Sequence, residues 1–401
     1  MPTWNLASDT LIHDIRYDFA NGIVVYNQTQ YTDLMTRRVN EPPKLGNANI
    51  GLENVSNELR AVYGTQQDVL SGMAGLYYAN TKIDETLSFA GRSSFADTKD
   101  NLGLFTEASY RLTDQWTLTG GLRYEADAVK RLGVTSLART RLDYDRTFTT
   151  LLPRLSIAYA VTPDWTVGAL VSRGANPGGV ALDFTSGQWR PFNAETLWNY
   201  EAFSRASLLD DRLTLNSNVF YTDFTDTQRL VNVFLAPGLV QSYVVNAEKA
   251  HAFGLETALD YQILDTVKLR ISAGALEAEF DRLSSDVALQ GNRFAKSPGY
   301  MLNVGASWDV TQALNLSATV RHIDGYFSDD ANTRLYQVKP YTMADARVSY
   351  RLDDAVELYA YAQNLFDERA PTYLQQNRGG NILEASMTVP RSMGVGMRGS
   401  F

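Results

Sequence analysis

The stretch YRLTDQWTLTGGLRYE, Tyr110 to Glu125, alternates in the manner of a β-hairpin. Successive side chains of a strand point to opposite faces, so residues two apart share a face. One face of the second arm collects Trp116, Leu118, Gly120, Leu122 and Tyr124, and the other collects Thr117, Thr119, Gly121, Arg123 and Glu125. The polar Thr113-Asp114-Gln115 between the arms is typical of a tight turn. The stretch therefore predicts two amphipathic strands joined by a short turn.

The same pattern recurs along the chain, in stretches that begin at Leu155, Glu201, Ala258, Val304 and Ala344. In each, one alternating arm leads into a short turn containing Asp or Thr, and a second alternating arm leads out. Seventeen strands are predicted, centred near residues 15, 29, 58, 75, 106, 122, 154, 170, 202, 219, 251, 273, 304, 319, 346, 361 and 397. The predicted fold class is all-β, with antiparallel strands.

The connections between these strands alternate in length. Short connections are predicted at 20–21, 113–115, 162–164, 209–211 and 352–355, and long ones at 37–52, 81–100, 129–146, 176–195, 280–298 and 366–392. A soluble sandwich or propeller would have shorter strands and no reason for this alternation. Long strands with tight turns at one end and large loops at the other are typical of a transmembrane β-barrel of the outer-membrane type.

The placement of aromatic and charged residues supports a membrane barrel. Aromatic residues lie beside the short turns, as in an interfacial girdle: Tyr110, Trp116, Tyr159, Trp165, Tyr261, Trp308 and Tyr350. The alternative is that aromatic residues are simply common in strands. One face of the strands is mostly aliphatic, and the other is polar, with Arg154, Asn216, Asn218, Lys268, Arg270, Glu357 and Gln363. These two faces predict a lipid-facing exterior and a wet interior.

Composition argues against several other classes of protein. The chain has 36 basic and 45 acidic residues, a net charge of -9, which argues against nucleic-acid binding. It has no cysteine and three histidines, His13, His251 and His322, with no nucleophile motif beside them, so we expect a protein that is not an enzyme. No metal site is expected, and Asp329-Asp330 is predicted to lie in a solvated loop, although calcium is conceivable there. The start of the chain lacks the features of a secretory signal, so the protein is either cytoplasmic or preceded by further sequence.

Several segments together carry a family resemblance. They are ANPGGVALDFTSGQWRPFNAETLWNYE (Ala175–Glu201), VVNAEKAHAFGLETALDY (Val244–Tyr261), NLFDERAPTY (Asn364–Tyr373) and VPRSMGVGMRGSF, which ends on Phe401. Nearly the whole chain resembles the siderophore-receptor branch of the TonB-dependent outer-membrane receptors. The resemblance implies that Phe401, on the last strand, is the signal read by the barrel-insertion machinery. It also implies the bacterial outer membrane as the location, with lipid around the barrel.

The resemblance further implies a plug domain inside a barrel of about 22 strands. No segment here resembles the plug or its TonB-contacting box, so residues 1–401 are expected to form an incomplete barrel domain without plug and first strands. The expected function is TonB-dependent uptake of a ferric siderophore or a similar large, scarce nutrient, with the TonB complex acting through the missing plug. The alternatives are a passive porin-like channel whose lumen is tuned by Arg123, Arg154, Lys268 and Arg270, a nonfunctional barrel fragment, and an adhesin or soluble β-repeat domain.

Substrate contacts in such receptors come from the loops, the luminal wall and the plug apex. The resulting candidates are Asn176, Trp189, Arg190, Phe192, Tyr326, Phe327, Tyr336, Tyr373 and Arg378. Aromatic faces with cations suit a ferric chelate of phenolate or catecholate type, through stacking and charge. The alternative for each residue is that it packs against other loop residues. No cofactor is expected, and iron enters only as part of a bound siderophore.

Overall fold

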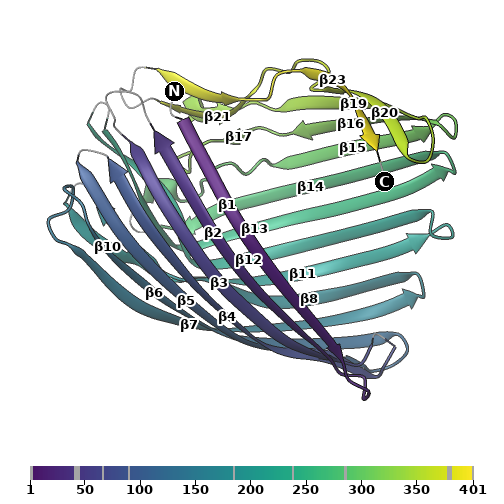
Figure 1. Ribbon diagram of the computed structural model, residues 1–401, viewed down its shortest axis with the longest axis horizontal. Coiled ribbons are helices and arrows are strands. Elements are labelled where there is room, and N and C mark those ends of the chain that lie inside the picture. The colour runs from purple at the N-terminus through teal and green to yellow at the C-terminus, as the bar shows by residue number, and fades with distance from the viewer. Residues whose placement is uncertain are drawn as a thin grey trace.

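The computed structural model describes residues 3–39, 46–65, 67–88, 91–183, 186–236, 239–283, 287–376 and 382–399, and only the backbone of 230–236 and 239–243. Within these ranges the chain forms one 17-stranded sheet in which each strand pairs antiparallel with the next (Figure 1). Its strands are β1 (Thr3–Asp18), β2 (Val24–Val39), β3 (Asn47–Tyr63), β4 (Leu70–Ser88), β5 (Arg92–Arg111), β6 (Trp116–Val134), β7 (Leu142–Thr162), β8 (Trp165–Asn176), β11 (Glu195–Leu208), β12 (Leu213–Ala236), β13 (Leu239–Leu264), β14 (Val267–Arg282), β15 (Tyr300–Asp309), β16 (Leu314–Ile323), β19 (Tyr341–Arg351), β20 (Val356–Gln363) and β23 (Ser392–Gly399). The described residues contain no helix that is long and apolar enough to cross a membrane.

The number of predicted strands is confirmed, and every predicted centre falls inside one strand of the sheet. Short elements occupy the longer connections. They are the hairpins β9 (Gly179–Asp183) with β10 (Gln188–Phe192), β17 (Tyr326–Phe327) with β18 (Gln337–Val338) and β21 (Pro371–Gln376) with β22 (Leu383–Met387), and the single turns η1 (Val287–Leu289) and η2 (Arg334–Tyr336). None of these short elements was predicted, because they are too short to show a period.

Three of the predicted long loops, 37–52, 81–100 and 129–146, are wrong as loops. Most of their residues continue the strands, and β4 and β5 remain paired from Leu70 opposite Tyr110 up to Ser88 opposite Arg92. The reason lies in the side chains: beyond Tyr78 the formerly apolar face of β4 carries Lys82 and Asp84, both exposed. Once a strand rises above the bilayer both of its faces meet water, and the alternation of apolar and polar residues disappears.

The polar face of the sheet is its concave face. The β9–β10 hairpin lies against β5 and β13 on that face. In the sheet, these two strands are separated by β6, β7, β8, β11 and β12. Its Trp189 ring stands edge-on to Phe95 of β5 at 6.1 Å, and the nearby Asn193 N–H donates to Asn246 Oδ1 of β13 at 2.8 Å. One hairpin can reach both strands only from inside the curve of the sheet, which Figure 1 shows.

The convex face carries two aromatic girdles. The girdle predicted beside the short turns is confirmed on this face, where Trp116 packs on Tyr159 with ring centroids 4.6 Å apart. A second girdle lies toward the loop end and consists of exposed Tyr78, Tyr124, Tyr200, Tyr221, Phe253 and Tyr300. Leucine, isoleucine, valine, alanine and glycine dominate the convex positions between them. Two aromatic belts around an apolar band are the pattern that a bilayer selects.

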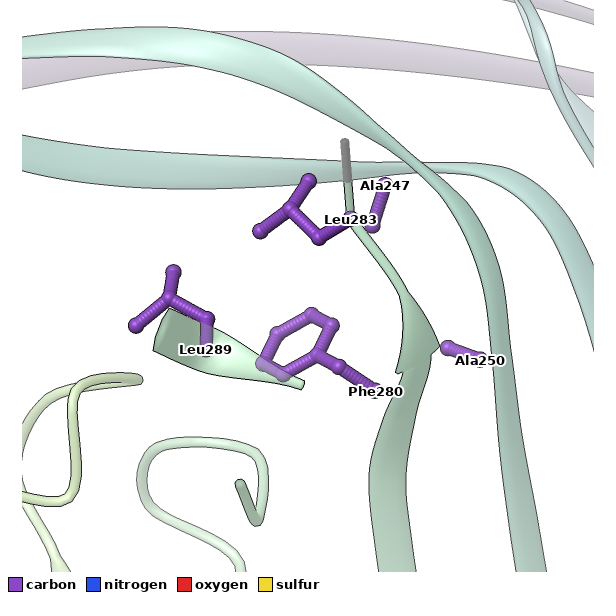
Figure 2. Packing of buried hydrophobic residues seen from close by; sticks show 5 residues of the cluster. All are labelled: Ala247, Ala250, Phe280, Leu283 and Leu289. Atoms are coloured by element: carbon purple, nitrogen blue, oxygen red, sulfur yellow. The ribbon is translucent and has the colours of Figure 1, made fainter. Parts of the chain in front are cut away.

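Glycine makes room for aromatic rings on the concave face. A Cβ atom on Gly254 would lie 2.4 Å from the Phe220 ring, and one on Gly168 would lie 2.3 Å from the Phe203 ring. Each ring therefore occupies the space that a side chain on the neighbouring strand would fill. Near the loop end the same face holds a small buried core, in which Phe280 lies between Leu289 of η1 and Ala250 of β13 (Figure 2).

We expect Gly254→Ala to lower the free energy of unfolding by about 1–3 kcal/mol, because the added methyl group must displace the Phe220 ring. The matched control is Gly274→Ala on β14, where the nearest atom to the new methyl group would be 3.9 Å away. Denaturant unfolding in detergent micelles, followed by tryptophan fluorescence, measures both variants. Equal stability of the two would show that the Phe220 contact contributes nothing.

Candidate ligand-binding mouth

At the loop end of the sheet, the connections gather over the concave face. We call this region the mouth: the β9–β10 hairpin, residues 287–299, residues 324–340, and residues 364–376 with 382–391. Figure 1 places β10, β17 and β21 at this same end. The hairpin of the mouth contacts Phe95 and lies beside Asn246 on the concave face, so it lies on the polar wall and not on the aliphatic convex face.

The β9–β10 hairpin presents Trp189 and Arg190 in fixed positions. The Trp189 Nε1–H donates to Thr140 O at 3.0 Å, and Arg190 forms an ion pair with the buried Asp183 at 2.6 Å. The Arg190 side chain remains 59% exposed, so its guanidinium group can still meet a ligand. Phe192 packs within the hairpin, since a Cβ atom on Gly179 would lie 2.5 Å from its ring.

Asn176 belongs to the base of this hairpin. Its Nδ2–H donates to Glu195 Oε1 at 3.2 Å, where β8 ends and β11 begins. Glu195 is 8% exposed, and its carboxylate also accepts from Thr227 Oγ1 and from the Gln228 backbone N–H, both at 2.6 Å. The segment that carries the resemblance, Asn176 to Glu195, thus begins and ends on one buried hydrogen-bond network.

A second group of candidates packs where residues 324–340 meet residues 371–376. The Tyr326 hydroxyl donates to Thr372 O at 2.8 Å, the Tyr336 hydroxyl donates to Gln376 Oε1 at 3.0 Å, and Lys296 Nζ lies 4.7 Å from the centre of the Tyr373 ring. Burial raises the pKa of Tyr326 to about 12, so this phenol is neutral at physiological pH. Phe327 pairs with Gln337 in the small hairpin of β17 and β18.

The structure therefore sorts the candidates into two groups. Trp189, Arg190 and Phe192 lie in the hairpin, and Tyr326, Phe327, Tyr336 and Tyr373 lie in the second group. Arg378 and Phe401 lie outside the described residues. Most of these side chains contact other mouth residues, and the described residues contain no group of three or more His, Cys, Asp or Glu that could hold a metal ion.

Sequence reasoning missed Lys296 of the mouth and Arg229 of β12, which contacts the mouth. Arg229 forms an ion pair with Asp330 at 2.5 Å, and its guanidinium carbon lies 4.4 Å from the centre of the Phe294 ring. The prediction of a solvated loop at Asp329-Asp330 is therefore wrong, because the Asp330 side chain is only 9% exposed. Nothing in the local sequence links residues 229 and 330, and only the folded chain brings them together.

The concave wall below the mouth is charged, and the four cations considered for a passive channel lie near acidic side chains. Arg123 pairs with Glu125 at 3.2 Å, and Arg154 lies 3.7 Å from Glu107. Lys268 and Arg270 both reach Asp260, at 3.6 and 2.7 Å. These are the four cations that a passive channel would use to select ions, and three carboxylates lie beside them, because Lys268 and Arg270 share Asp260.

The two histidines within predicted strands, His251 and His322, lie on the convex face and stack on tyrosine rings. The His251 ring stacks on Tyr221 at 6.0 Å, and its Nδ1 lies 2.8 Å from Asp281 Oδ1. The His322 ring stacks on Tyr300 at 5.4 Å. Both rings therefore belong to the second aromatic girdle or its border.

The chain matches known proteins over most of its length. The family model described as TonB dependent receptor-like, beta-barrel, matches residues 2–365. The pesticin receptor of Yersinia pestis is 26% identical over 360 residues, which are 86% of this chain and 51% of that protein. The chain spans about half the length of the curated relatives it matches.

Solved structures share the fold. The ferric yersiniabactin uptake receptor FyuA from Yersinia pestis superposes with a TM-score of 0.86 at 23% identity, covering 100% of this chain and 62% of that one. The siderophore receptor PiuA from Acinetobacter baumannii superposes with a TM-score of 0.81 at 15% identity, covering 99% and 64%. With the family model matching more than nine-tenths of the sequence, the chain belongs to the TonB-dependent receptors, β-barrel proteins of the bacterial outer membrane.

Proposed function

We propose that this protein captures a ferric siderophore at its mouth for TonB-dependent uptake. The family consists of transporters and not enzymes. The observation that carries the proposal is the β9–β10 hairpin, which holds an indole and an exposed guanidinium group over a concave polar wall. An aromatic face beside a cation suits an anionic, aromatic ferric chelate. Iron would enter only as part of the chelate, and the family relatives named for siderophores support this substrate class.

We further propose that the sheet is part of the wall of a closed barrel, with lipid around its convex face. Over the described residues, β1 pairs only with β2 and β23 only with β20. In an antiparallel sheet with an odd number of strands, the first and last strands run in the same direction. Antiparallel closure therefore needs an odd number of further strands, of which the first and last run in the opposite direction. A second copy in the same orientation has an odd number of strands, but its first and last strands run in the same direction as β1 and β23, so it does not close the barrel. Without them, unpaired backbone groups would meet hydrocarbon at several kcal/mol each.

In this proposal, energy reaches the mouth from the TonB complex through a plug, and the barrel-assembly machinery recognises the terminal Phe401. A passive channel is the second candidate for the same fold. The carboxylates beside Arg123, Arg154, Lys268 and Arg270 argue against it, because a selective pore needs charge that faces the permeating ion.

The test is uptake of radioactive iron by cells that express the protein from its own gene, supplied with a panel of ferric phenolate, catecholate and hydroxamate siderophores. The proposal predicts that uptake of at least one phenolate or catecholate chelate is lost when either the gene or TonB is deleted. Uptake that persists without TonB would indicate the passive channel. Uptake of no chelate would exclude a siderophore as the substrate.

The matched variants are Arg190→Gln in the hairpin and Arg369→Gln, whose exposed side chain pairs with Asp367 at 3.1 Å. We expect Arg190→Gln to weaken binding of the chelate about tenfold, the effect of losing one charge-assisted contact. Arg369→Gln should bind normally. Equal affinities for both variants would remove Arg190 from the site.

A further inference from the structure

We propose that three consecutive residues at the loop end of β12, Thr227, Gln228 and Arg229, couple the separate parts of the mouth so that they move as one body. We call these residues the β12 junction. Coupled parts would let the proposed capture site close as a unit around its ligand, so the biological meaning of the coupling rests on the proposed function. The coupling itself can be measured without any ligand.

The first half of the β12 junction holds the β9–β10 hairpin. Thr227 Oγ1–H and the Gln228 backbone N–H both donate to the buried Glu195 carboxylate at 2.6 Å. The Gln228 Nε2–H donates to Pro177 O at 2.8 Å and to Asn193 O at 3.0 Å. Pro177 and Asn193 flank the two strands of the hairpin, so one side chain fixes both of its ends.

The second half of the β12 junction holds the other loops. Arg229 Nε and Nη2 donate to Asp330 Oδ2 at 3.1 Å and to Oδ1 at 2.5 Å, a two-pronged contact with residues 324–340. Asp330 Oδ1 also accepts from the Ala295 backbone N–H at 2.8 Å, which brings in residues 287–299. The Arg229 and Asp330 side chains are 22% and 9% exposed. Breaking a largely buried pair leaves an uncompensated charge and costs far more than losing a surface pair.

The links extend to the last part of the mouth. The Leu374 backbone N–H donates to Ser328 Oγ at 2.9 Å, beside the Tyr326 contact with Thr372 at 2.8 Å. Residues 371–376 are therefore tied to residues 324–340 and are expected to move with them. The contacts run continuously from the hairpin to residues 371–376 of the mouth.

The geometry of β12 makes its junction a rigid connection. Its three residues pair in unbroken register with Ala247, Asn246 and Val245 of β13. Directly before them, Asp226 has a left-handed backbone (φ 56°), and Asn246 Nδ2 donates to its carbonyl at 2.6 Å. Because the Gln228 backbone N–H donates to Glu195 and Arg229 is the next residue on the same paired strand, a displacement of the hairpin acts on the backbone that positions Arg229. A ligand that pulls on one part of the mouth would thereby bias the others.

Hydrogen exchange of the protein from its own gene, reconstituted in lipid nanodiscs and read by mass spectrometry, tests the coupling. Arg229→Gln removes the ion pair to Asp330 but leaves every contact of the hairpin. We expect exchange to rise about tenfold or more within 287–299 and 324–340, and also within the hairpin, 179–183 and 186–192. Exchange that rises only within 287–299 and 324–340 would overturn the proposal.

The reciprocal variant is Gln228→Ala, which removes the side-chain contacts of the hairpin and leaves Arg229 in place. It should raise exchange within 324–340 as well as in the hairpin, and a purely local effect would again overturn the proposal. Gln228→Ala also tests the coupling if the Arg229→Gln variant does not fold. The control is Arg293→Gln, whose half-exposed contact with Glu279 at 3.8 Å lies outside these links and should leave the hairpin unchanged.

Charge reversal separates coupling from general loss of structure. Arg229→Asp should deprotect the mouth, and adding Asp330→Arg should restore protection in the hairpin as well as at the reversed pair, but not within 287–299, because arginine cannot accept the Ala295 N–H. Failure of the hairpin to recover while 324–340 recovers would contradict the coupling. Because no siderophore is present, these results stand whether or not the proposed substrate is correct.

Discussion

Replacing Asn364 by alanine should lower the free energy of unfolding by about 3–5 kcal/mol, an effect large enough to prevent stable assembly. The Asn364 side chain is 1% exposed; its Nδ2 donates to Glu368 O at 3.0 Å and to Val389 O at 2.8 Å, while its Oδ1 accepts from the Glu368 N–H at 2.8 Å. Alanine would leave these buried groups without partners. It would also occupy a left-handed backbone position (φ 49°) that asparagine tolerates and alanine does not.

The side chain and the backbone can be separated experimentally. Asn364→Gly removes the same hydrogen bonds but accepts the left-handed conformation, so it should recover about 1 kcal/mol relative to alanine. Gln363→Ala, one residue earlier, keeps all contacts of Asn364 and should change stability little. Guanidinium unfolding in detergent measures all three variants. A stability of Asn364→Ala within about 0.5 kcal/mol of the parent protein would mean that the network is not structural.

Leu122→Arg should destabilise the protein by about 2–4 kcal/mol in a bilayer, because it places a charge between the two aromatic girdles of the convex face. The matched control is Thr119→Arg on the concave face of the same strand, where water and polar neighbours surround the new charge. Reversible unfolding from lipid vesicles compares the two variants. If both variants were equally stable, or the control were the weaker, the assignment of the faces would be wrong.

The sheet could be predicted because its physics is local. From Leu118 to Leu122, apolar residues that face lipid alternate with residues that face water. This period of two predicts both that the segment is a strand and which side chains share a face. Prediction from this alternation failed where both faces of a strand meet water. Lys82 and Asp84 extend β4 into water, so the extension of the strand left no periodic signal.

The mouth could be predicted only in outline. Loop aromatics and cations such as Trp189 and Arg190 stood out by type, but their partners are distant in the chain: Trp189 donates to Thr140, and Arg229 pairs with Asp330, 101 positions away. Two asparagines of the family motifs are explained by hydrogen bonds within the protein and not by contact with a ligand. Asn176 and Asn364 both serve buried hydrogen-bond networks at the ends of loops. A motif therefore marks a position that needs a particular residue, and only the folded structure shows which contacts require it.

The central claim is that the two faces of the strands meet lipid and water, and accessibility of spin labels along Trp116 to Glu125 tests it most directly. Single cysteines bearing nitroxides would be introduced in turn into the protein reconstituted in vesicles, with oxygen as the lipid-soluble relaxant and a nickel chelate as the water-soluble one. We predict that oxygen accessibility peaks at positions 118, 120 and 122 and nickel accessibility at 117, 119 and 121. Accessibility without this period of two, or with the two relaxants exchanged, would contradict the membrane barrel.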